Sequence, residues 1–110
     1  MKYKNKSYIL NILTFFKMVK VTLNLLNIFA LRTGKNKILY EADTVGEVIK
    51  QFIEQHRAHL DENLLDKKKK KLNGQMLVLI NGQNIKQLEG YKTKLKEDDK
   101  VYISYPISGG

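Results

Sequence analysis

The sequence predicts an α+β domain in which a mixed sheet packs on one main helix. Three observations lead to this prediction: the length of the chain, one apolar stripe at helical spacing, and several short apolar segments separated by turn residues. A chain of 110 residues, 43% of them hydrophobic, can bury one core of ordinary size but not two. An amphipathic helix in such a domain must bury its apolar stripe against a sheet.

Two strands are predicted at the start of the domain. Apolar and mostly polar residues alternate from Val19 to Leu25, and this period of two is typical of a half-buried strand. The strand is expected to run on through Phe29 to a turn at 33–36, and a second strand is expected at about 37–41. Glycine and asparagine in the turn tolerate the positive φ of a tight hairpin, so the two strands should pair.

The main helix is predicted over residues 45–56. Thr44 and Glu47 have the spacing of a capping box, in which each side chain bonds to the amide of the other residue. Behind the box, apolar residues recur at the i, i+3, i+4, i+7 and i+8 positions of one helix face. They are Val45, Val48, Ile49, Phe52 and Ile53.

The second half of the chain supplies three more strands. A continuous apolar run at 76–80 predicts a buried central strand. Asn81 and Gly82 predict a tight turn into a short strand at 83–85. An acidic turn then leads to a last strand at 101–105, which a proline ends. The resulting order, β-β-α-β-β-β, describes a β-grasp domain.

The net charge of +9 arises from two local features. The lysines responsible lie at positions 2, 4, 6 and 17 and in the unbroken run 67–71, and the rest of the chain has as many acidic as basic residues. The run belongs to a polar, irregular segment at 57–75, which is predicted to be an inserted, solvated loop. Such a run could bind phosphates or RNA. No aromatic residue interleaves with it to stack on bases, so no nucleic-acid partner is expected.

Residues 1–17 are predicted to be an extension, disordered or upstream of a natural start at Met18, ahead of the domain at 18–110. The apolar stretch 8–16 is too short to span a membrane, which takes roughly 20 residues, and no small-residue cleavage site follows it. No membrane partner is therefore expected, and the chain is expected to be cytoplasmic. The absence of cysteine fits a reducing compartment.

Three stretches, 19–34, 43–49 and 78–110, match the pattern of a known family. The last contains INGQNI and LEGYKTKLKEDDKVYISYPISGG, which are similar to the family's NGxDI and GxxTxLxDGDEVxxxPPxxGG. On these residues the chain resembles the ubiquitin-like β-grasp sulfur carriers, and most of all the small subunit of molybdopterin synthase in its archaeal form. It departs from the pattern at Asp98, where the family has glycine, and at Tyr105, where the family has proline.

The resemblance implies that the chain carries its chemistry on its last residue. A ubiquitin-activating-type adenylyltransferase would use ATP to adenylate the carboxylate of Gly110, and sulfur would then replace the adenylate to give a thiocarboxylate. The chain would be the non-catalytic sulfur donor beside the large subunit of molybdopterin synthase, with no tightly bound cofactor of its own. Gly109 and Gly110 lack a Cβ, so the flexible tail at 106–110 can thread a narrow channel, and Pro106 favours an extended exit.

Side chains near the tail are predicted to face partner proteins. Tyr102 and Ser104 alternate with core positions of the last strand, and Ser104 stands where the family often has a bulky partner-contacting residue. No metal site is expected, because His56 and His59 lack a third ligand at a suitable spacing. The predicted partner-facing residues are Leu26, Phe29, Tyr102, Ser104, Tyr105, Pro106, Ile107 and Ser108.

Other functions remain open from the sequence. The chain would be a ubiquitin-like protein modifier if Gly110 formed isopeptide bonds with lysines of target proteins. It would also fit the resemblance as a sulfur carrier for thiamine or for tRNA. A basic RNA-binding domain is a further class, and it predicts salt-dependent binding through the lysine run at 67–71.

Overall fold

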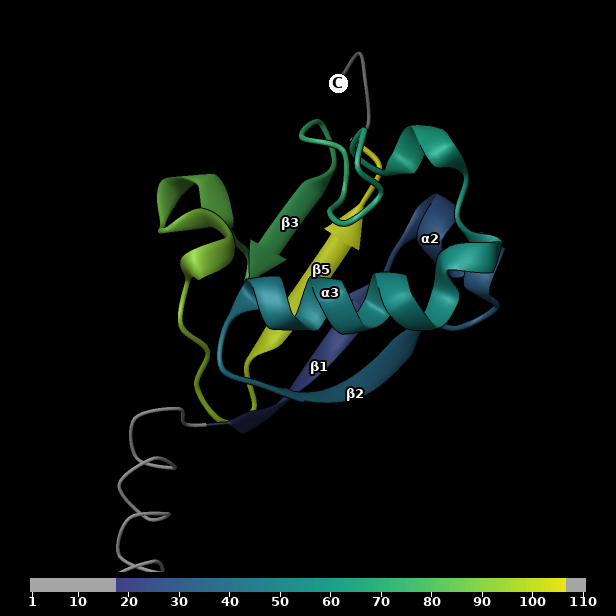
Figure 1. Ribbon diagram of the computed structural model, residues 1–110. Helices are drawn as coiled ribbons and strands as arrows, with labels where there is room; N and C mark the ends of the chain where they lie inside the picture. Colours follow the sequence, from purple (N-terminus) through teal and green to yellow (C-terminus); the bar gives the residue numbers. More distant parts are fainter. Residues whose placement is uncertain (1–17, 107–110) are drawn as a thin grey trace, which may run out of the picture.

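A five-stranded mixed sheet with the strand order β2-β1-β5-β3-β4 forms the centre of the computed structural model, which describes residues 18–106 (Figure 1). The helix α3 lies across one face of this sheet, which confirms the predicted α+β β-grasp class. The predicted extension at 1–17 and residues 107–110 of the predicted tail lie outside the described residues. The strands are β1 (Val19–Leu25), β2 (Lys37–Ala42), β3 (Leu77–Ile80), β4 (Gln83–Asn84) and β5 (Lys100–Ser104). The helices are α2 (Asn27–Thr33), α3 (Val45–His56) and the 3₁₀ helices η1 (Arg57–His59), η2 (Glu62–Leu64), η3 (Ile85–Gln87) and η4 (Gly90–Lys92).

The strand nearest the end of the chain, β5, lies in the middle of the sheet. It pairs in parallel with β1, with Leu23 beside Val101, and antiparallel with β3, with Val78 beside Ile103. Because β1 and β5 run in the same direction, the start of β1 and the end of β5 lie at opposite ends of the sheet (Figure 1). The chain therefore leaves the sheet from its centre, at the end opposite to the one where it enters.

The helix α3 forms as the sequence predicts, but with only half of its capping box. The Oγ1 of Thr44 accepts a hydrogen bond from the Glu47 amide at 3.3 Å. The reciprocal bond from the Glu47 side chain to the Thr44 amide is not formed within residues 18–106. Thr44 also lies opposite Lys94 in an isolated bridge, whose hydrogen bonds are made by the residues on either side. The five apolar residues of the predicted stripe are each at most 1% exposed, so the stripe is confirmed.

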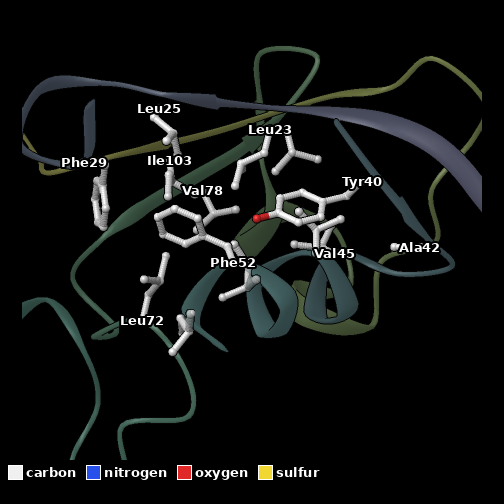
Figure 2. Close-up of a cluster of buried hydrophobic side chains, with 14 of the residues drawn as sticks. Leu23, Leu25, Phe29, Tyr40, Ala42, Val45, Phe52, Leu72, Val78 and Ile103 are labelled. Carbon is white, nitrogen blue, oxygen red and sulfur yellow. The ribbon is translucent and has the colours of Figure 1, made fainter. Parts of the chain in front are cut away.

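The core fills the space between α3 and the sheet (Figure 2). Phe52 points from α3 toward the sheet, where Ile103 of β5 lies, and neither side chain is exposed. The rings of Phe52 and Phe29 meet edge to face with their centroids 6.3 Å apart, which is a favoured arrangement for aromatic pairs. Buried apolar area of this kind is the main favourable term in the folding of the domain.

The connection between β1 and β2 is a helix, not the predicted strand extension and tight turn. Asn27 takes a positive φ of 39° just after β1 and begins α2. Gly34, at a φ of 72°, ends α2 by donating its amide to a carbonyl of the last turn. The two strands still pair antiparallel, as predicted. The apolar run 28–31 fits a strand or a helix by periodicity alone, and the helix is the conformation that brings Phe29 into the core.

The other strand predictions need smaller corrections. β3 is an internal strand between β5 and β4, as expected, but it is fully buried on one face only, through Val78 and Ile80. β5 ends one residue earlier than predicted, at Ser104. The tight turn between β3 and β4 is confirmed, with φ values of 49° at Asn81 and 88° at Gly82.

The inserted segment at 57–75 is more ordered than the predicted irregular loop. It contains η1 and η2, and an isolated bridge joins Leu65 to Leu72. The lysine run at 67–71 is exposed, as predicted. The sequence did not predict this order, because the segment is mostly polar in composition. Four isolated leucines of the segment are buried in the main core and attach the segment to the domain. They are Leu60, Leu64, Leu65 and Leu72.

Candidate functional site

The end of β5 is the place where the chain leaves the sheet toward the predicted Gly-Gly tail. In Figure 1, α2 stands beside this end of β5. The link between β1 and α2 is held there, because the amide of Leu26 donates to the Ile103 carbonyl at 3.1 Å. The site is therefore built from two segments that are far apart in the sequence. We call its residues the tail-exit site: Leu26, Asn27, Ser104, Tyr105 and Pro106.

Asn27 holds the residues that follow β5. Its Oδ1 accepts a hydrogen bond from the Tyr105 amide at 3.0 Å, and its Nδ2 donates to the Tyr105 carbonyl at 3.1 Å. Its Nδ2 also donates to the Oγ of Ser104 at 2.8 Å. Asparagine tolerates the left-handed backbone found here better than most residues do. One side chain thus binds both backbone groups of Tyr105 and sets the direction of the chain up to Pro106.

Two of the predicted partner-facing residues are buried, which corrects the predicted patch. Phe29 is 0% exposed, because it lies on the core side of α2. Ser104 is 7% exposed, because Asn27 covers its hydroxyl, which itself donates to the Tyr105 carbonyl at 2.9 Å. In the described fold Phe29 packs in the core and Ser104 bonds within the tail exit, so neither side chain is exposed beside it.

Other predicted residues do form a surface beside the exit. Leu26 and Tyr105 are 43% and 44% exposed, and Tyr102 is half-buried on the sheet face opposite α3. Leu26 and Tyr102 line a shallow hollow of about 560 Å³ together with Leu79 and Lys100. The structure therefore brings Leu26 and Tyr102 together as the sequence predicts. The predicted residues Ile107, Ser108, Gly109 and Gly110 lie outside the described residues.

Both departures from the family pattern have a structural reason. Asp98 takes a φ of 68°, so an aspartate occupies a left-handed position where the family has glycine, and aspartate is one of the few residues that do so readily. Its amide donates to the Lys20 carbonyl at 2.9 Å and ties the acidic turn to β1. At the second departure, the Tyr105 amide donates to Asn27, which a proline, having no N–H, could not do.

Asn27 is the residue of this site that sequence reasoning missed. It follows an apolar strand pattern directly, and an asparagine at such a place is a signal for a left-handed residue that ends the strand. The pattern alone did not reveal its partners, because Ser104 and Tyr105 lie 77 and 78 residues further along the chain.

The rings of His56, the last residue of α3, and His59 of η1 lie with their centroids 6.5 Å apart. Partial burial lowers the pKa of His56 below its usual 6.5, and the nearby charges of Lys35 and His59 lower this pKa further. Within residues 18–106, no three histidine, cysteine, aspartate or glutamate side chains group as metal ligands. In the same part of the chain, no helix has the length and apolarity needed to cross a membrane.

Comparison with protein families identifies the group to which these features belong. The model of the ThiS family matches residues 28–110, from α2 to the last glycine. The chain belongs to the ThiS family. The matched residues include the acidic turn, the strand β5 that leads to the tail exit, and the Gly-Gly end. It confirms the resemblance to the ubiquitin-like β-grasp sulfur carriers. No curated protein sequence matches the chain.

Solved structures of similar proteins share the fold of this ThiS-family chain. The solution structure of the small archaeal modifier protein SAMP1 from Methanosarcina acetivorans has a TM-score of 0.73 and 30% identity, covering 84% of this chain and 98% of that one. A putative molybdopterin converting factor subunit 1 from Pyrococcus furiosus has a TM-score of 0.59 and 19% identity over 81% and 99% of the two chains. CysO, in its complex with BexX from Amycolatopsis orientalis, has a TM-score of 0.62 and 23% identity over 82% and 99%. The ThiS-family chain is a ubiquitin-like sulfur carrier or modifier.

Proposed function

We propose that this ThiS-family protein carries sulfur on Gly110 for the synthesis of molybdopterin, as the small subunit of molybdopterin synthase. The observation that carries the proposal is the tail exit itself. The central strand of the sheet ends in a segment that Asn27 holds on both sides of Tyr105, and the sequence continues from there through Pro106 to Gly109 and Gly110. A fixed exit ahead of a short glycine tail suits a protein that must present its last residue to other enzymes.

The proposed chemistry divides between this chain and its partners. A ubiquitin-activating-type adenylyltransferase joins the Gly110 carboxylate to AMP from ATP, and pyrophosphate leaves. Sulfide from a partner then attacks the acyl carbon, AMP leaves, and Gly110 becomes a thiocarboxylate. The sulfur comes from a partner because this chain has no cysteine. In the active site of the large subunit, in the cytoplasm, the thiocarboxylate sulfur bonds to the substrate, and water then cleaves the acyl–sulfur bond and restores the Gly110 carboxylate. The chain supplies no catalytic side chain and needs no tightly bound cofactor.

The surface beside the exit is the proposed contact for both partners. Leu26, Tyr102 and Leu79 line the hollow on the open face of the sheet, and Tyr105 stands exposed where the chain leaves. Aromatic side chains such as Tyr102 and Tyr105 are enriched in the buried centres of protein interfaces. A partner that docks here receives the tail in a defined direction.

Mass spectrometry of the intact protein tests the proposal. Incubation with the activating enzyme, ATP and a sulfur source should exchange one oxygen for sulfur at Gly110. Deletion of Gly110 should abolish the exchange without changing the thermal midpoint, since removing a terminal glycine takes away no buried side chain. The control is Gly74→Ala, which changes another glycine that has nothing within 4 Å of an added Cβ. An unmodified carboxylate in the complete mixture would refute the proposal.

A second candidate is conjugation to other proteins. It is favoured by the 30% identity to SAMP1, a small archaeal modifier protein, over 98% of that chain. In this case Gly110 would form isopeptide bonds with target lysines, and digests of cell protein would contain lysine peptides that carry the tail remnant. Complementation of strains that lack the sulfur carrier for molybdopterin, thiamine or thiolated tRNA separates the sulfur pathways.

A further inference from the structure

A cavity of about 510 Å³ lies between α3 and the loop that carries the lysine run. The loop follows η2 and leads into β3 (Figure 1). Cavities that hold small molecules usually measure about 300–1,000 Å³. None of the residues that line this cavity belongs to the tail-exit site, so the proposed sulfur chemistry does not use it.

One wall of the cavity is formed by a face of α3 and by Arg57, the residue that follows it and begins η1. Lys50 and Glu54 are four residues apart, and residues at this spacing share one side of a helix. Ile53 lies between them and is only 1% exposed, so it forms an apolar base under the charged side chains. This wall therefore carries one cation from α3, Lys50, and one from the residue directly after it, Arg57.

The opposite wall carries Lys70 and Lys71, and their backbone is held in place. The Oδ1 of Asp66 accepts hydrogen bonds from the amides of Lys70 and Lys71 at 3.0 and 3.3 Å. The Asp66 amide donates to the Lys71 carbonyl at 2.9 Å. On either side of this loop, Leu65 and Leu72 are buried and form a bridge. The two lysines therefore face the cavity from a tied loop, which reduces the entropy lost on binding.

Tyr91 closes the cavity between the two walls. Its hydroxyl accepts a hydrogen bond from the Leu72 amide at 3.2 Å, and the Nζ of Lys71 lies 5.6 Å from the centre of its ring, within reach of a cation–π contact. Gly46 of α3 makes room for this segment, because a Cβ there would lie 3.1 Å from the Tyr91 carbonyl oxygen. Three separate elements thus meet around one small space.

The charges around the cavity are unbalanced. Four cationic side chains and one carboxylate line it, which is a net charge of +3. The ion pairs within residues 18–106 join Arg32 to Asp61, Lys69 to Glu62 and Lys94 to Asp43, so none of them involves a cation of the cavity. The Asp66 carboxylate lies close enough to Lys71 and Tyr91 to act on both, but it does not line the cavity and offsets only one of the positive charges. Positive charges gathered in a hollow make the local electrostatic potential more positive, and this potential attracts anions.

We propose that this cavity binds a small polyanion of the diphosphate class. A diphosphate group matches the net charge and has several oxygens that ammonium and guanidinium groups on both walls can bind at once. A single-stranded nucleic acid would in addition need a row of exposed aromatic faces, whereas one aromatic residue, Tyr91, lines the cavity, and Lys71 lies over its ring.

Isothermal titration calorimetry of the full chain with sodium pyrophosphate, at constant ionic strength, tests the proposal. Saturable binding to one site is expected. The double variant K70Q/K71Q should weaken it by about tenfold or more, since each lysine can donate a charged hydrogen bond. The matched control K67Q/K68Q removes the same charge from the same run at positions that do not line the cavity, and it should change the affinity by less than about twofold.

The outcomes separate this proposal from its alternatives. Equal weakening in both double variants would show a general effect of charge and would overturn it, as would the absence of saturation. Tighter binding of an oligouridine that depends on both lysine pairs would assign the loop to RNA instead. Thermal midpoints that agree among the variants show that folding is intact. Deletion of Gly110 should leave pyrophosphate binding unchanged, so this proposal and the proposed function fail separately.

Discussion

Replacement of Asn27 by glycine tests how the tail exit is built. The side chain makes three hydrogen bonds to the end of β5, with distances of 2.8–3.1 Å, and none of them can be made by glycine. Glycine accepts the positive φ of 39° at this position without a steric penalty. Asn27→Gly therefore removes the bonds without adding backbone strain, which alanine would add.

The expected cost is about 2 kcal/mol of unfolding free energy. Asn27 is exposed, so each of the three bonds should contribute near the lower end of the usual range, about 0.5 kcal/mol. Their sum is about 1.5 kcal/mol, and the greater freedom of glycine in the unfolded chain adds about 0.5 kcal/mol. Ser104→Ala removes the partner of one of the same bonds and should cost about 0.5–1 kcal/mol.

Urea denaturation gives the unfolding free energies, and amide hydrogen exchange locates the change. The Tyr105 amide, which donates to Asn27, should lose its protection in Asn27→Gly, while the Leu26 amide, which donates to Ile103, should keep its own. The double variant with Ser104→Ala should cost less than the sum of the single variants, because both remove one shared bond. Strict additivity, or full protection of Tyr105 in Asn27→Gly, would refute this account of the exit.

Three further predictions concern the core and the titration of single groups. Phe29→Ala should lower the unfolding free energy by about 3–4 kcal/mol in urea denaturation, because the ring is fully buried; a cost near zero would place Phe29 on the surface after all. An NMR pH series should show the pKa of His56 below 6.5, chiefly because the ring is partly buried, and Lys35→Gln should raise this pKa. Since the pKa of His56 is lower in the folded state than in the unfolded state, protonation of the ring destabilises the fold. The contribution of His56 to the unfolding free energy is therefore complete above pH 6.5 and is lost as the pH falls through the folded value. Burial raises the pKa of Tyr40 to about 12, so the contribution of its neutral hydroxyl to the unfolding free energy is complete below pH 10 and is lost as the pH rises toward 12. An ultraviolet titration of tyrosinate formation should show a late step that Tyr40→Phe removes. A Tyr40 midpoint near pH 10 would contradict the burial.

The elements with strong local signals could be predicted from the sequence. The apolar residues from Val45 to Ile53 share one side of the chain only if the segment is helical. The Asn81-Gly82 pair permits the left-handed turn that joins β3 to β4. The alternation from Val19 to Leu25 likewise predicts which face of β1 is buried. In each case the information lies within one short segment, where spacing and backbone preference act together.

The elements that depend on distant contacts could not be predicted in the same way. Residues 28–31 are all apolar, and such a short run is compatible with a strand or with a helix. The contact of Phe29 with Phe52 favours the helix. Ser104 looks like an outward-facing strand residue until Asn27 covers it. The lysine run looks like a free loop until buried leucines beside it hold it against α3.

By itself, the sequence determined the β-grasp order, the main helix and the glycine tail of this ThiS-family protein, because these follow from periodicity, turn chemistry and composition within short windows. The tertiary structure decided that the chain leaves from the centre of the sheet, that Asn27 holds its exit, and that two lysines of the run face Lys50 and Arg57 across a cavity. These features join residues that are distant in sequence. Their placement depends on strand order and on packing around one shared core, and no local pattern encodes either.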